Sequence, residues 1–107
     1  MLIVVIEAVT ANAAEAQRLL AEARPLCAAT REEKGCLDYS FALDCVDSAS
    51  VRVIERWQDQ AAMSAHLKMP YLEAFMGFMQ SVTVKSMSAK VYDASGERDL
   101  FRPAVAE

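Results

Sequence analysis

Two alternating segments joined by a short polar turn constrain the fold of this 107-residue chain more than any other feature. In residues 36–45 and 51–58, apolar side chains recur at every second position. One face of the first segment carries Leu37, Tyr39, Phe41 and Leu43, and one face of the second carries Val51, Val53, Glu55 and Trp57. This period of two predicts half-buried strands, and the short turn between them predicts an antiparallel hairpin.

A long helix is expected before this hairpin. Residues 10–35 are rich in alanine, with leucines at helical spacing, and Thr10 or Asn12 can cap the start. Gly35 can end the helix. Pro25 lies inside it, and because proline costs about 3 kcal/mol in a helix interior, we expect a kink or a break there.

Two shorter helices are expected after the hairpin. Asp59 can cap the first of them, and Pro70 suits the first turn of the second. The apolar stripe of the second helix is Leu72, Phe75, Met76 and Met79. The chain is therefore expected to turn once between two helices before its last strand.

Two further strands are expected, one before the long helix and one after the two short helices. Residues 2–9 are apolar on both faces, and residues 81–93 alternate. The order strand, helix, strand, strand, helix pair, strand predicts an α+β, ferredoxin-like βαββαβ fold. Its four-stranded antiparallel sheet has helices on one face. We place the domain at residues 1–93 and a C-terminal tail at residues 94–107.

The apolar character of the first expected strand predicts that the chain associates with a second copy of itself. Helices cover one face of the expected sheet, yet both faces of residues 2–9 are apolar. An identical subunit can cover the other face, because exposed apolar surfaces mark interfaces and most oligomers are symmetric. We expect a homodimer that forms through this sheet face.

Composition excludes several classes of function. The net charge is −4, which argues against nucleic-acid binding. The apolar start is short, lacks a basic segment and is interrupted by Glu7, so we expect no signal peptide or membrane span, and a cytoplasmic location. Cys27, Cys36 and Cys45 have no metal-ligand spacing, and the chain has no glycine-rich phosphate loop. We therefore expect no metal and no cofactor.

Few polar groups remain for chemistry. The single histidine, His66, is the natural acid or base, although its spacing also fits an ordinary residue at a helix edge. Glu55 shares a strand face with apolar residues and can pair with an arginine, hold His66 or act as a base itself. Trp57 can form an aromatic wall, and Tyr39 and Tyr71 can donate to a ligand oxygen. Met63 and Phe75 can shape an apolar pocket, although core packing explains each of them equally well.

Two motifs in these regions resemble those of antibiotic biosynthesis monooxygenase (ABM) domains. The stretch IERWQDQAAMSAHLKMPYLEAF is similar to the pattern of a strand ending in Glu-x-Trp, a short helix ending in His, and then a proline and an aromatic residue. The stretch EEKGCLDYSF is similar to the family's strand opening, Glu-x-Gly-Cys-x-x-Tyr. The resemblance covers about residues 2–93 and is nearest to the small quinol monooxygenases of the family.

This resemblance implies a dimer whose sheets pack together, with a pocket between sheet and helices in each subunit. It also implies cofactor-independent oxidation of a quinol or polycyclic phenol by molecular oxygen. In this reaction His66 or Glu55 would be the proton acceptor, with Trp57 and Tyr71 positioning the ring. Related domains that degrade haem use an asparagine on the first strand, where this chain has Glu7 and no asparagine.

Two other functions fit the same residues. One is a non-catalytic dimeric module that binds a small ligand, and the other is an isomerase of a small oxygenated metabolite. Oxygen consumption separates them from the monooxygenase, because neither of them needs oxygen.

Overall fold

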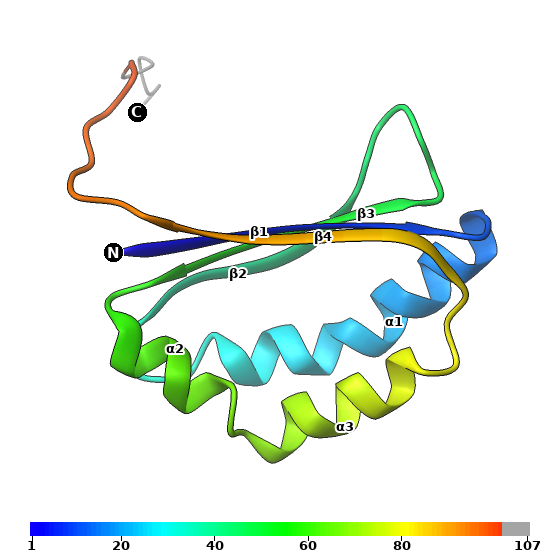
Figure 1. Cartoon of the computed structure of the whole chain (residues 1–107), viewed down its shortest axis with the longest axis horizontal. Helices are drawn as coiled ribbons and strands as arrows, with labels where there is room; N and C mark the ends of the chain where they lie inside the picture. The colour runs from blue at the N-terminus through cyan, green and yellow to red at the C-terminus, as the bar shows by residue number, and fades with distance from the viewer. Residues whose placement is uncertain (102–107) are drawn as a thin grey trace, which may run out of the picture.

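Four strands form one antiparallel sheet, and three helices cover one of its faces (Figure 1). The computed structural model describes residues 1–101, so the last six residues of the expected tail, 102–107, lie outside the described part. The elements are β1 (Leu2–Thr10), α1 (Ala13–Thr30), β2 (Cys36–Leu43), β3 (Ser50–Trp57), α2 (Gln60–His66), α3 (Pro70–Met79) and β4 (Val84–Asp93). The strand order β2-β3-β1-β4 confirms the predicted ferredoxin-like fold.

The core lies between the helices and the sheet face that the β3 alternation predicts. Trp57, Val51 and Val53 are buried on this face, and Leu19 and Ala23 of α1 pack against it. Burial of these apolar side chains is the main favourable term in folding. Among the described helices, none is long and apolar enough to cross a membrane.

The helix α1 begins as predicted but ends differently. The Asn12 side chain caps it by accepting a hydrogen bond from the backbone N–H of Glu15 at 2.9 Å. The helix runs unbroken through Pro25, so of the expected kink or break the break is wrong. Three of the six residues that α1 buries, Ala23, Leu26 and Cys27, flank the proline, and this packing offsets the lost hydrogen bond.

Gly35 serves the following turn instead of ending α1, which stops at Thr30. Its backbone φ is +83°, a conformation that glycine adopts without strain. A Cβ at this position would lie 2.6 Å from Cβ of Ala62. The turn therefore requires glycine at this position for two reasons, the positive φ and the close approach of α2.

The register of β2 differs from the simple alternation at its first residues. Cys36 pairs with Trp57, whereas Tyr39 pairs with Glu55, so Leu37 is an extra residue in the ladder. This bulge puts Cys36, rather than Leu37, on the face shared with Tyr39. Leu37 is 48% exposed, and its expected place on the core face is wrong.

The two short helices follow their predicted starts. The Asp59 side chain accepts from the backbone N–H of Ala62, and Pro70 is the first residue of α3. Within the expected stripe of α3, Phe75 is buried and Met76 is 56% exposed. Met76 thus lies outside the core, contrary to the sequence prediction.

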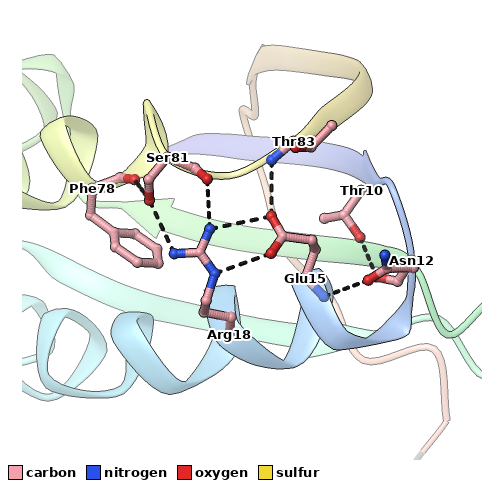
Figure 2. A network of polar contacts seen from close by, with 7 residues as sticks. All are labelled: Thr10, Asn12, Glu15, Arg18, Phe78, Ser81 and Thr83. Atoms are coloured by element: carbon pink, nitrogen blue, oxygen red, sulfur yellow. Dashed lines mark hydrogen bonds and ion pairs between the residues drawn. The ribbon is translucent and has the colours of Figure 1, made fainter.

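At the start of α1, a surface network ties this helix to the turn between α3 and β4 (Figure 2). The Arg18 guanidinium donates to Oε1 of Glu15 at 3.1 Å, to the Ser81 carbonyl at 2.6 Å, and lies 5.1 Å from the Phe78 ring centroid. Oε2 of Glu15 accepts from the backbone N–H of Thr83 at 3.0 Å. The pKa of Glu15 is lowered mainly by the hydrogen bond from Arg18.

Candidate functional site

His66 lies buried at the end of α2 and is held by a carboxylate from the loop after α1. Its Nδ1 is 2.9 Å from Oε2 of Glu33, and the two side chains are 2% and 6% exposed. The Tyr71 hydroxyl donates to the same oxygen. An ionised carboxylate only accepts hydrogen bonds, so this geometry assigns the proton to Nδ1. Among residues 1–101, Nε2 of His66 has no hydrogen-bond partner, which leaves it available to accept a proton.

Two aromatic rings enclose His66 on the sheet side. The centroid of its imidazole is 4.8 Å from that of Trp57 and 5.1 Å from that of Tyr39. Trp57 is the last residue of β3, and Tyr39 lies in β2, where it pairs with Glu55 of β3. Both residues are on the helix-facing side of the sheet, so strand alternation directs them at α2. The structure thus brings Trp57, Tyr39 and His66 together, and their role in substrate binding or catalysis stays a prediction.

Glu55 lies beside the same rings but does not hold His66. Its Oε1 accepts a hydrogen bond of 2.9 Å from Nε1 of Trp57, while Glu33 binds the imidazole. Burial raises the pKa of Glu55, and the hydrogen bond from Trp57 and the charge of His66 oppose this shift. Of the expected roles for Glu55, the described contacts show neither an arginine partner nor a bond to His66, and the role of a base stays a prediction. Its observed partner, Trp57, was not expected.

The two tyrosines differ in their surroundings. Burial raises the pKa of Tyr39, whose hydroxyl group stays protonated throughout the physiological range. For Tyr71, burial and the hydrogen bond to Glu33 raise the pKa to about 12. Tyr71 is partly exposed, so its phenol connects the buried pair to the surface.

Phe75 and Met63 belong to the packing around this cluster. Phe75 is buried, with its ring centroid 5.8 Å from Phe41 and 6.0 Å from Phe78. Met63 is partly buried against the core. The structure therefore gives both residues apolar contacts, and a role in substrate binding stays a prediction.

Several hollows mark the described surface, around α1, at the start of β2, and beside the α2–α3 turn. Tyr39 lines one of them, of about 120 Å³. None of these hollows is lined by His66, Glu55 or Trp57. These three side chains fill the space between the sheet and α2.

Glu33 is the residue that reasoning from periodicity missed. It lies in a charged loop, and its partners His66 and Tyr71 are 33 and 38 residues away in sequence. The one available signal was its place in the Glu-x-Gly-Cys stretch of the family-like motif. Across the described residues, no group of three or more His, Cys, Asp or Glu side chains is arranged to hold a metal ion.

Comparison with known proteins now identifies the family. The model for antibiotic biosynthesis monooxygenases matches residues 1–77. The chain belongs to this family. ABM membership supports a general monooxygenase-like or small-molecule-binding role for the chain.

Solved structures share the ABM fold. A candidate antibiotic biosynthesis monooxygenase from Deinococcus radiodurans is 25% identical, with a TM-score of 0.85 over 94% of this chain and 99% of that chain. A Pseudomonas aeruginosa protein is 27% identical, with a TM-score of 0.74 over 89% of this chain and 95% of that chain. An uncharacterized Synechocystis protein is 32% identical over 63 residues, which are 59% of this chain and 43% of that protein. The match thus spans less than half of this relative's length.

Proposed function

We propose that this ABM protein is a cofactor-independent monooxygenase that oxidises a quinol or polycyclic phenol with molecular oxygen. The observation that carries the proposal is the buried Glu33–His66 pair, which leaves Nε2 of His66 free beside an aromatic wall. Family membership and the name of the Deinococcus relative support the same reaction type.

The proposed chemistry needs a proton acceptor and an ordered, water-poor site. Nε2 of His66 takes the phenolic proton, and the resulting electron-rich phenolate reduces oxygen and forms a C–O bond to it as a hydroperoxide. Loss of water with cleavage of the O–O bond leaves a carbonyl, so the substrate supplies all the electrons and the second oxygen atom leaves as water. Glu33 holds the imidazole through its Nδ1 proton, so that Nε2 is the nitrogen that faces the substrate. Glu55 is the second candidate base, since its raised pKa makes it a better proton acceptor than an ordinary carboxylate.

The aromatic residues are proposed to position the substrate ring. Trp57 and Tyr39 form the wall next to His66, and Phe75 and Met63 supply apolar contacts. Tyr71 is the partly exposed member of the cluster, so we propose that the substrate enters past Tyr71 to reach His66. Because the cluster is tightly packed, this access requires Tyr71 to move away from Glu33.

The test is oxygen consumption with a reduced naphthoquinone as substrate. We expect His66→Ala to lower kcat at least about 100-fold, the usual contribution of general base catalysis. Arg18→Ala, at the far end of the helices, is the matched control and should keep the wild-type rate. An equal rate in His66→Ala would remove His66 from the reaction, and aromatic binding without oxygen uptake would favour the ligand-binding module.

We further propose that the protein acts as a homodimer through the outer sheet face. Ile54 and Tyr92 point away from the helices and are 38% and 52% exposed. Ile54 pairs with the partly buried Val5, and Tyr92 pairs with the partly buried Ile3. Such an apolar strip on a sheet fits a self-complementary interface. Light scattering after size exclusion should give twice the monomer mass at micromolar concentration, and Ile54→Glu should give the monomer. A wild-type monomer would contradict the proposal.

A further inference from the structure

We propose that the groove between α1 and β2 is a second binding site, for an organic carboxylate with a flat apolar body. A hollow of about 370 Å³ lies there, within the size range of small-molecule sites. Its lining residues are Leu20, Ala23, Arg24, Cys27, Ala28, Arg31 and Phe41. None of them belongs to the candidate site around His66, so this site goes beyond the proposed oxidation.

Two unpaired arginines give the groove its ligand preference. Elsewhere Arg18, Arg52 and Arg56 form ion pairs with carboxylates at 3.1, 2.8 and 3.8 Å. Arg24 and Arg31, by contrast, have no ion pair within residues 1–101. In a chain with a net charge of −4, this leaves a local positive groove that an anion can neutralise.

Arg31 is already oriented for a planar anion. Its Nε donates to the backbone carbonyl of Tyr39 at 2.9 Å, which fixes the guanidinium along the edge strand β2. The two terminal nitrogens have no protein partner in the described part, and together they match a carboxylate held by two parallel hydrogen bonds. Arg31 is the C-cap residue of α1 and keeps a helical backbone, so Arg24, seven residues earlier, projects from the same side about two turns away.

The floor of the groove is apolar and aromatic. Phe41 is half-buried, and its ring packs 5.8 Å from Phe75 and 5.9 Å from Tyr39. Ala23 is buried, and burial also raises the pKa of the Cys27 thiol, so the floor carries no charge. An aromatic ring can lie on this floor while its carboxylate reaches Arg31, so we expect small hydrophilic anions to bind more weakly than aromatic carboxylates.

The experiment uses 2-naphthoate as the probe and its uncharged amide, 2-naphthamide, as the matched ligand. Binding is measured by calorimetry, and backbone amide shifts in NMR locate the site. We expect naphthoate to bind and to shift signals of α1 and β2, with binding weakened about tenfold in Arg24→Gln or Arg31→Gln. Arg31→Lys keeps the positive charge but cannot make two parallel hydrogen bonds, so we expect it to weaken naphthoate binding less than Arg31→Gln does.

Arg56→Gln is the control, because this arginine is paired and lies in β3 outside the groove. It should bind naphthoate as the wild type does. Equal affinity for naphthoate and naphthamide, equal affinity in the Arg24→Gln/Arg31→Gln double variant, or shifts confined to α2 and α3 would each overturn the proposal. So would an absence of binding to the wild type. None of these results depends on oxygen consumption, so the site and the proposed reaction fail independently.

Discussion

Two carboxylates, Glu33 and Glu15, join separate elements of this molecule in the same way but in opposite surroundings. Glu33 binds His66, which is buried, and Tyr71, which is partly buried. Glu15 instead binds Arg18 and the backbone N–H of Thr83 at the surface. The Glu33 and His66 side chains are 6% and 2% exposed, compared with 22% and 41% for Glu15 and Arg18. Solvent weakens the exposed pair, while the buried pair interacts in a medium of low polarity.

Burial separates the polar groups that can carry chemistry in this fold from those that only connect its elements. At the surface end of the helices, the network of Figure 2 fastens α1 to the α3–β4 turn. At the buried end, the same kind of contact orders an imidazole that can take up a proton. We therefore expect changes in the buried cluster to have large effects, and changes in the surface network to have small ones.

The largest effect is expected from Glu33→Ala. This change leaves Nδ1 of His66 and the hydroxyl group of Tyr71 without their shared acceptor, and breaking a buried pair costs about 3 kcal/mol. Urea denaturation monitored by Trp57 fluorescence measures the loss. Glu33→Gln retains an acceptor and should lose clearly less. A loss below about 1 kcal/mol in Glu33→Ala would mean that the buried cluster is no stronger than a surface pair.

A gain in stability is expected from Glu55→Gln. Because burial raises the pKa of Glu55 above its ordinary 4.5, the folded state holds this proton more tightly than the unfolded chain. That contribution is fully present below pH 4.5 and is lost as pH rises through the raised pKa. The amide carries no charge and can still accept from Trp57, so the variant should be about 1 kcal/mol more stable at pH 8. Equal stability of both proteins from pH 4 to pH 8 would contradict the raised pKa.

The smallest effect is expected from Arg18→Ala. The exposed contacts to Glu15 and Ser81 are screened by water, so Tm should fall by roughly 2–4 °C. High salt should reduce the difference between variant and wild type. A loss as large as that of Glu33→Ala would abolish the distinction between the two regions.

The sequence allowed most of the sheet to be predicted because strand alternation is a local signal. The pattern of Val51, Val53, Glu55 and Trp57 correctly assigned their shared face. The caps at Asn12 and Asp59 were equally local, since each side chain binds a backbone group three residues on. These features follow from short-range geometry and need no knowledge of the tertiary structure.

The features that sequence reasoning missed depend on contacts made elsewhere. Glu33 lies in a loop without periodicity, and its role arises only when α2 and α3 fold back over it. The bulge at Leu37 adds a residue to one strand alone, which a pattern of alternation cannot show. The intact helix around Pro25 depends on packing against the core, which outweighs local propensity.

The position of the proton on the His66 ring decides whether Nε2 can act as the base, and nitrogen NMR of the ring measures that position directly. His66 is the only histidine, so its ring signals need no assignment. In the neutral ring we predict the proton on Nδ1, held by Glu33, with Nε2 unprotonated, and Glu33→Ala should shift the proton to Nε2. A wild-type spectrum with the proton on Nε2 would contradict the proposed base and the hydrogen bond that positions it.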